Sequence, residues 1–264
     1  MTEWLTVGRG DAPLVVSIPH AGVLIPDDID GLVSREQATH DADHHVEKLY
    51  AFARGMGATI LHSRISRTAI DLNRDPSGKS LYPGQATTAL CPATNFDGEP
   101  LYVAGAEPSA AEIERRRSCY FDPYHAALRG EIDRLRALHP AIVLYDAHSI
   151  RSHVPRLFDG ELPQYNIGSF DGASCDSGLT NAIAAHCAGA GHVVNGRFKG
   201  GWITRHYGAP ARGIHAVQME LSIRGYAAED GAWPPPWDPA RAAPMQAMLR
   251  AILATCLDFA KDQR

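Results

Sequence analysis

The sequence predicts an α/β fold with a largely parallel or mixed sheet. Short runs of β-branched or other apolar residues alternate along the chain with segments of helical periodicity, which is the order of elements in such folds. Three of these runs are continuous enough for strands in the middle of a sheet that is covered on both faces. No run approaches the roughly 18 apolar residues that would indicate a membrane span.

The predicted strands cover residues 13–18, 58–61, 141–145 and 216–221. Helices separate them. One is expected over residues 46–53, where apolar side chains recur at helical spacing and glycines follow. A capping box at 109–112 opens a helical stretch to about residue 138, and a last helix is expected from about residue 239 to 259. In an open sheet of this kind, functional residues lie just beyond the carboxyl ends of the strands.

Composition indicates one globular domain spanning residues 1–264. Hydrophobic residues make up 45% of the chain, which is enough for a sizeable core. The 25 Lys and Arg against 30 Asp and Glu give a net charge of −5, so nucleic acid and anionic membranes are not expected partners. The five cysteines are scattered and lack a CxxC spacing, which argues against a disulfide framework or a cysteine zinc site and favours a reducing cytoplasm.

Two histidines stand in equivalent places after predicted strands. His20 follows the strand at 13–18, and His148 follows the strand at 141–145. A single histidine in such a place would more often be an ordinary loop residue. Asp146 can orient the imidazole of His148, as metal-bound histidines require, so the pair predicts a metal site.

A catalytic zinc takes a third protein ligand and keeps its fourth position for water. The acidic and histidine-rich segment 40–45 is the richest source of that ligand. We predict Asp43, with Asp41 or His45 as alternatives, because either aspartate could instead cap the following helix. His45 is expected to be the histidine that neighbours the site, in preference to His44.

Glu220 lies within the otherwise apolar strand 216–221. A carboxylate in such a strand is costly unless it is paired or faces a cleft. Close to a metal it would act as the general acid and base, whereas on an edge strand it would be a solvent-facing residue. Several arginines lie near these positions, and guanidinium groups bind carboxylates in a bidentate manner, so an anionic substrate is expected.

Taken together, these segments resemble the N-formylglutamate amidohydrolase (deformylase) family of histidine degradation. The resemblance runs through Ser-Ile-Pro-His-Ala-Gly at 17–22, Asp-Ala-Asp-His-His-Val at 41–46, Asp-Leu-Asn-Arg at 71–74, Tyr-Asp-Ala-His-Ser-Ile-Arg at 145–151, Asn-Gly-Arg-Phe-Lys-Gly-Gly-Trp at 195–202 and His-Ala-Val-Gln-Met-Glu-Leu at 215–221. After about residue 226 we find no motif that matches.

The resemblance implies a three-layer α/β/α fold with a mixed, largely parallel sheet, similar to zinc carboxypeptidases and aspartoacylases. It also implies a zinc-dependent enzyme that releases formate and L-glutamate from N-formyl-L-glutamate. Those peptidases carry a second ligand three residues after the first histidine, but Val23 stands there, so the carboxylate is expected from Asp43.

The roles that we expect are as follows. Zn²⁺ is held by His20, Asp43 and His148, and Glu220 transfers protons. The two substrate carboxylates are gripped by arginines and an asparagine, with candidates Arg67, Asn73, Arg74, Arg151 and Arg205. One alternative is a zinc amidohydrolase for another N-acyl amino acid or an anionic peptide end, because one methyl group is worth only about 1–3 kcal/mol in a pocket. A second is a metal-dependent binding protein for an acidic ligand.

Overall fold

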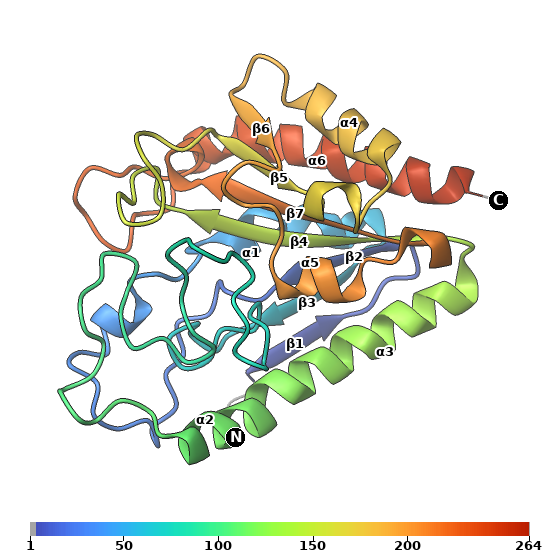
Figure 1. Cartoon of the computed structure of the whole chain (residues 1–264). Coiled ribbons are helices and arrows are strands. Elements are labelled where there is room, and N and C mark those ends of the chain that lie inside the picture. The colour runs from blue at the N-terminus through green and yellow to red at the C-terminus, as the bar shows by residue number, and fades with distance from the viewer. Residues whose placement is uncertain (1–3, 264) are drawn as a thin grey trace.

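Seven strands form one mixed sheet within residues 4–263, the part of the chain that the computed structural model describes (Figure 1). Their order across the sheet is β1-β3-β2-β4-β7-β5-β6. The strands are β1 (Leu5–Gly8), β2 (Leu14–Ile18), β3 (Thr59–Ser63), β4 (Ile142–Ile150), β5 (Tyr165–Gly168), β6 (His192–Val194) and β7 (Ile214–Ser222). β3, β2, β4 and β7 run parallel to one another, whereas β1 and β5 pair antiparallel to their neighbours β3 and β7.

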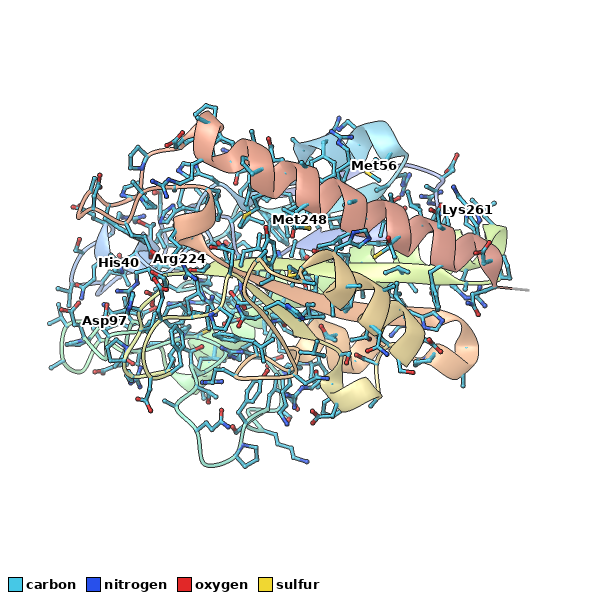
Figure 2. The ribbon with its side chains drawn as sticks, turned by 90° about the horizontal axis from the view of Figure 1, so that it is seen from above. His40, Met56, Asp97, Arg224, Met248 and Lys261 are labelled. Carbon is cyan, nitrogen blue, oxygen red and sulfur yellow. The ribbon has the colours of Figure 1, made fainter. Side chains whose placement is uncertain are left out.

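Helices cover both faces of the sheet. They are α1 (Val46–Leu49), α2 (Ala110–Arg116), α3 (Asp122–Leu138), α4 (Ser177–His186), α5 (Trp202–Tyr207) and α6 (Pro239–Asp262). In Figure 1, α4 and α6 lie above the sheet and α3 and α5 below it. The view from above in Figure 2 shows α6 extending along the sheet. The three-layer α/β/α arrangement is therefore confirmed.

The two cores follow from the alternation of side chains along the strands. Leu14, Val16 and Ile18 of β2 point into the core beneath α1, α4 and α6, whereas Val15 points into the core beneath α3. All residues of β2 are buried, as they are in β4 and β7. This is why these strands appear in the sequence as continuous apolar runs, and it leaves the strand ends as the natural place for polar chemistry.

The structure corrects the predicted elements in several places. The prediction missed β1, β5, β6, α4 and α5, and β5 is a fully buried strand that contains Asn166 and Gly168. The helix predicted over residues 46–53 is a short α1 followed by a 3₁₀ segment, Ala51–Met56. The stretch from 109 to 138 is divided into α2 and α3 by a π-helical segment, Arg117–Phe121, and Ser109 caps α2 by accepting a hydrogen bond from the Glu112 amide.

β4 is the most consequential difference, because it continues to Ile150 instead of ending at Tyr145. His148 therefore lies inside a strand and not in a loop after one. It pairs in register with Glu220 of β7. Since neighbouring residues of parallel strands project their side chains to the same face, the extension of β4 places a histidine and a carboxylate side by side.

The long connections gather at the carboxyl ends of the parallel strands (Figure 1). Figure 2 shows His40, Asp97 and Arg224 at this end of the molecule. No helix among the described residues is long and apolar enough to cross a membrane.

The close approach at Gly22 provides a test of this arrangement. A Cβ at Gly22 would lie 2.1 Å from the carbonyl carbon of Arg64, so Gly22→Ala must displace the chain that follows β2. We expect a loss of about 2 kcal/mol or more in the free energy of unfolding, measured by urea denaturation. Gly130→Ala is the matched control: a Cβ there meets no atom of residues 4–263 within 4 Å. It should stabilise α3 by about 1 kcal/mol. Equal effects of the two substitutions would contradict the packing at Gly22.

Candidate active site

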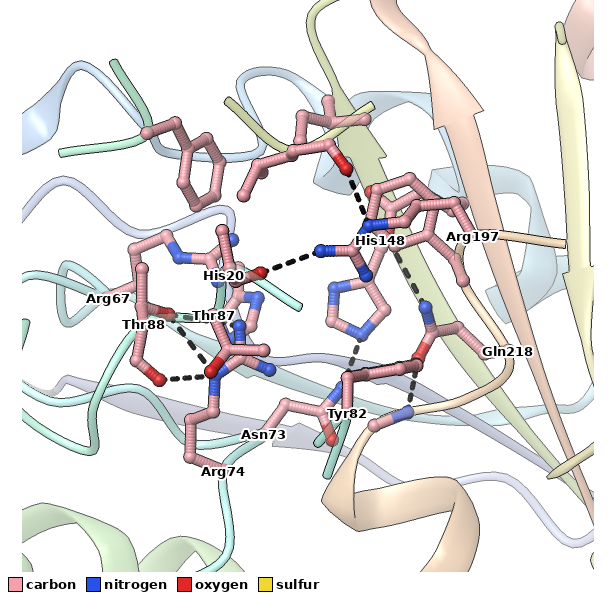
Figure 3. Close-up of a pocket in the computed structure, with 17 residues that line it drawn as sticks. His20, Arg67, Asn73, Arg74, Tyr82, Thr87, Thr88, His148, Arg197 and Gln218 are labelled. Carbon is pink, nitrogen blue, oxygen red and sulfur yellow. Dashed lines mark hydrogen bonds between the residues drawn. The ribbon is translucent and has the colours of Figure 1, made fainter. Parts of the chain in front are cut away.

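A pocket at the carboxyl ends of the parallel strands brings together most of the predicted site residues (Figure 3). It encloses about 560 Å³, including the part that is open to solvent. Its lining comes from the segment after β2, from β4 and β7, and from the connections around residues 67–88 and 197–201. The lining residues that matter below are His20, Arg67, Asn73, Arg74, Tyr82, Ala86, Thr88, His148, Leu157, Arg197, Gln218 and Glu220.

Three predicted metal ligands converge beside this pocket. One potential ligand atom each of His20, Asp43 and His148 lies within 4.8 Å of the others, and all three residues are buried. Nδ1 of His148 lies 3.0 Å from Oδ2 of Asp43, and Nδ1 of His20 lies 3.9 Å from the same oxygen. The amide of Asp43 donates to the carbonyl of His20, which holds the two residues together although 22 residues separate them in the chain.

The other nitrogen of each histidine faces a buried carboxylate. Nε2 of His20 lies 2.8 Å from Oδ1 of Asp71, and Nε2 of His148 lies 3.0 Å from Oδ2 of Asp146. Such carboxylates fix the tautomer so that Nδ1 faces the metal. The orientation of His148 by Asp146 agrees with the sequence prediction.

The remaining polar atoms at this point fit a cation. Within the described part of the chain, Nδ1 of His20 and Oδ1 of Asp43 are buried without a hydrogen-bond partner. Unpartnered buried polar atoms are costly, and a divalent cation would satisfy both. Two imidazoles and one carboxylate are also the ligand set of many catalytic zinc sites.

Electrostatics favour the ligand form of His20 but not that of His148. Burial opposes protonation of His148, yet Asp146 and Asp43 hold its pKa well above the usual range, so this imidazole must release a proton when a metal binds.

Burial, together with Arg67, lowers the pKa of His20, so its imidazole is neutral as a metal ligand must be. Burial opposes ionisation of Asp71, but Arg74, His20 and Arg67 hold its pKa well below its usual range. Asp71 is therefore a permanent anion behind His20.

Glu220 lies on the pocket wall next to His148. Burial raises the pKa of its carboxyl to about 8, while the nearby His148 acts in the opposite direction. Nε2 of Gln218 donates to Oε2 of Glu220 at 3.2 Å, and the side-chain Oε1 of Gln218 accepts from the backbone amide of Gly201 at 2.7 Å. β7 lies between β4 and β5, so the alternative of a solvent-facing edge residue is excluded. The carboxyl is thus held in a dry site near neutral pKa, as general acid and base catalysis requires.

Asn73 connects β4 to the start of α5. Its Nδ2 donates to Oδ2 of Asp146 at 2.9 Å, and its Oδ1 accepts from the amide of Ile203 at 2.7 Å. A Cβ at Gly201 would lie 2.4 Å from this side chain, so a glycine is required there. The glycine pair at 200–201 therefore serves close packing against Asn73 and Thr204.

A buried network extends from Asp146 to the outer helix layer. Oγ of Ser17 donates to Oδ1 of Asp146 at 2.9 Å and lies 2.9 Å from the hydroxyl of Tyr124 on α3. All three side chains are fully buried. The orientation of Asp146 is thus determined by groups on β2 and α3.

Two predicted substrate arginines line the pocket. Arg67 is buried and donates to Oδ2 of Asp71 at 2.8 Å, and its other terminal nitrogen lies 3.5 Å from Oδ1 of Asp43. Arg74 donates to the Thr88 hydroxyl at 3.0 Å and lies 3.5 Å from Asp71 (Figure 3). Both can reach a ligand in the pocket.

The other two predicted arginines lie outside this pocket. Arg151 pairs with Asp97 at 2.8 Å and faces a separate small cavity. Arg205 donates to the carbonyls of Gly200 and Leu81 and stacks on Tyr82. The sequence predicted both arginines at the site because each lies close along the chain to other candidate site segments. In the structure, Asp97 and the backbone carbonyls hold their guanidinium groups outside the pocket.

His45 also differs from its prediction. It adopts a φ of 68°, its Nε2 lies 2.8 Å from the carbonyl oxygen of Pro235, and it does not line the pocket. Its ring contacts Trp237. His44 is the more buried of the two, but it packs against Trp233 and does not line the pocket either.

Sequence reasoning missed several pocket residues. Gln218 lies two residues before Glu220, and the period of a strand would have placed both on one face. Arg197 was visible as one of the arginines near the glycine pair but had no assigned role. Tyr82 and Thr88 come from an irregular segment whose position no local pattern predicts.

Comparisons with known proteins point to a single family. A sequence model of the N-formylglutamate amidohydrolase family matches residues 12–227. The N-formylglutamate deformylases of Pseudomonas putida and Pseudomonas aeruginosa are 46% and 45% identical over 267 aligned residues, which cover 100% of this chain and 99% of each relative. The crystal structure of N-formylglutamate amidohydrolase from Ralstonia eutropha JMP134 shares the fold, with a TM-score of 0.78, 23% identity and 97% coverage of both chains.

The chain therefore belongs to the N-formylglutamate amidohydrolase family, as its motifs predicted, and is an amide hydrolase.

Metal content tests the choice between the two aspartates. Asp43→Ala should lose most of the bound divalent metal, because it removes the carboxylate between the two histidines. Asp41→Ala is the matched control and should retain it, since Oδ2 of Asp41 accepts from the amide of Phe96. Atomic absorption after dialysis against limiting zinc measures both, with circular dichroism to verify folding. Undiminished metal in Asp43→Ala would move the ligand to Asp41 or His45.

Proposed function

We propose that this member of the N-formylglutamate amidohydrolase family hydrolyses N-formyl-L-glutamate to formate and L-glutamate, with Zn²⁺ as its cofactor. The observation that carries the proposal is the convergence of His20, Asp43 and His148 at the edge of the pocket whose wall carries Glu220. The names of the relatives support the choice of substrate.

Zinc would be held by Nδ1 of both histidines and by the carboxylate of Asp43, whose unpartnered atoms fit a cation. A zinc ion in such a site supplies a Lewis acid that polarises a carbonyl oxygen and lowers the pKa of water toward about 7. Asp71 and Asp146 keep the two imidazoles oriented for this task.

Glu220 moves the protons. Its carboxylate accepts a proton from the water that attacks the formyl carbon, and the new C–O bond forms as the carbonyl becomes tetrahedral. The same group then donates this proton to the amide nitrogen, so that the C–N bond breaks and the amine leaves. The hydrogen bond from Gln218 holds Glu220 in position for both transfers.

The arginines of the pocket would stabilise the negative charges of the substrate and of the tetrahedral state. Arg67 lies close to Asp43 and would stabilise the oxygen that becomes negative in the tetrahedral state. Arg74, with Asn73 beside it, would bind the α-carboxylate, which every N-formyl amino acid carries next to its amide. Two carboxylates on the substrate account for an excess of arginine in a pocket of a protein whose net charge is −5.

We also propose that the enzyme works in the reducing cytoplasm and in histidine degradation. All five cysteines are free, and four of them are buried. Burial raises the pKa of Cys256 and of Cys175, so neither is a reactive thiolate.

Formate release tests the proposed activity. Purified protein is incubated with N-formyl-L-glutamate, and formate is measured with formate dehydrogenase before chelation, after dipicolinate treatment and after zinc is restored. We expect release that chelation abolishes and zinc restores. N-acetyl-L-glutamate serves as the comparison substrate: faster hydrolysis of the acetyl compound would reject the formyl assignment, and undiminished activity without metal would reject the cofactor.

Glu220→Gln tests the proton carrier. The variant keeps the size of the side chain but cannot accept a proton, so kcat should fall by a factor of at least about 100. Metal content should stay unchanged because Glu220 is not one of the three proposed ligands. Near-normal kcat with full metal would exclude Glu220 as the general base.

A further inference from the structure

Arg197 occupies the pocket wall opposite to Arg74. In Figure 3 it enters from the right, from the connection before α5, whereas Arg74 lies at the lower left beside Thr88. Two carbonyls hold its guanidinium: Nε donates to Leu157 at 2.7 Å and Nη2 donates to Ala86 at 2.8 Å. A guanidinium has five N–H groups, so donors remain for a ligand.

Arg197 differs from the other pocket arginines in its charge environment. Arg67 pairs with Asp71 and Asp43, and Arg74 lies 3.5 Å from Asp71. Considering residues 4–263, Arg197 forms no ion pair with any carboxylate within 4.0 Å. Its Nη1 also donates to none of these residues. The positive charge of Arg197 is therefore available to a ligand.

Burial between aromatic rings makes the positive charge of Arg197 unfavourable in free energy unless an anion binds to it. The guanidinium lies 5.2 Å from the Tyr82 ring centroid and 5.4 Å from that of Phe198. Burial lowers the pKa of Arg197, which is the effect of removing a cation from water without a partner. The two rings and two carbonyls also restrict the side chain, so little further ordering is needed when a carboxylate binds.

We propose that Arg197 binds the side-chain carboxylate of the substrate and thereby selects acidic over neutral N-formyl amino acids. This inference rests on the proposed function. The two carboxylates of the substrate lie at different distances from the amide. Nδ2 of Asn73 lies 3.0 Å from Nε2 of His148, and Arg74 lies 3.5 Å from Asp71, the carboxylate that faces His20. Both residues therefore stand near the reacting centre, where they would bind the α-carboxylate. Arg197 is anchored on Leu157 and Ala86, on the pocket wall opposite Arg74, so we assign it to the carboxylate that lies farther from the amide.

The test compares two substrates that differ in this carboxylate alone. Arg197→Met removes the charge and keeps an apolar chain against Tyr82. We expect kcat/KM for N-formyl-L-glutamate to fall by a factor of at least about 30, as when one partner of a buried charge pair is removed. The value for N-formyl-L-glutamine should change by less than about threefold, which is within the scatter of one weakened neutral contact. An equal fall for both substrates would overturn the proposal, because Arg197 would then bind the α-carboxylate or support the fold.

Arg205→Met is the matched control, since Arg205 stacks on the same tyrosine at 4.7 Å but donates to backbone carbonyls outside the pocket. It should leave the ratio of the two kcat/KM values unchanged; a loss of preference as large as that of Arg197→Met would count against a specific role of Arg197.

Binding separates this inference from the proposed activity. Calorimetric titration with L-glutamate and L-glutamine should show that wild type prefers glutamate and that Arg197→Met does not. If wild type released no formate, the proposed activity would fail, and the titration would still decide the role of Arg197: equal affinities of wild type for the two amino acids would reject it.

Discussion

The parallel pairing of β2 with β4 is the constraint on which the site depends. Ser17 lies opposite Asp146 in this pairing, so His20 and His148 emerge at the same edge of the sheet. The further pairing of β4 with β7 places Glu220 beside His148. Three residues that are far apart in the chain are therefore positioned by strand register, which packing on both faces makes hard to change.

Buried carboxylates alternate with imidazole and guanidinium groups in the site. Asp71 and Asp146 lie behind the histidines, Asp43 lies between them, and Arg67 contacts Asp71 and Asp43 from the other side. Each buried carboxylate thus has a cationic or imidazole neighbour, which offsets part of the cost of removing it from water. This arrangement leaves Nδ1 of His20 and Oδ1 of Asp43 without a hydrogen-bond partner among the described residues, and this is the point at which the proposed cation would bind.

The sequence predicts which residue types form the site better than it predicts all the strands and the directions of long side chains. The four strands that it predicts are all present, and the structure brings His20, Asp43 and His148 together, although their role as ligands stays a prediction. β5 and β6 were missed because they are short and lack a continuous apolar run. Arg151 and Arg205 were misplaced because the direction of a long side chain depends on partners such as Asp97 and Leu81 that come from distant segments.

The hydroxyl of Ser17 links the active site to an outer helix through hydrogen bonds. It connects Asp146 to Tyr124, and Tyr124 belongs to α3, a helix whose opposite side faces solvent. Helix-cap and surface-charge substitutions are common ways to raise stability, and their recurrent cost is lost function where activity depends on a particular arrangement. In this enzyme, mutations that rotate α3 by a fraction of a turn would be transmitted to the imidazole of His148, so libraries on that helix need a screen for catalysis as well as for melting.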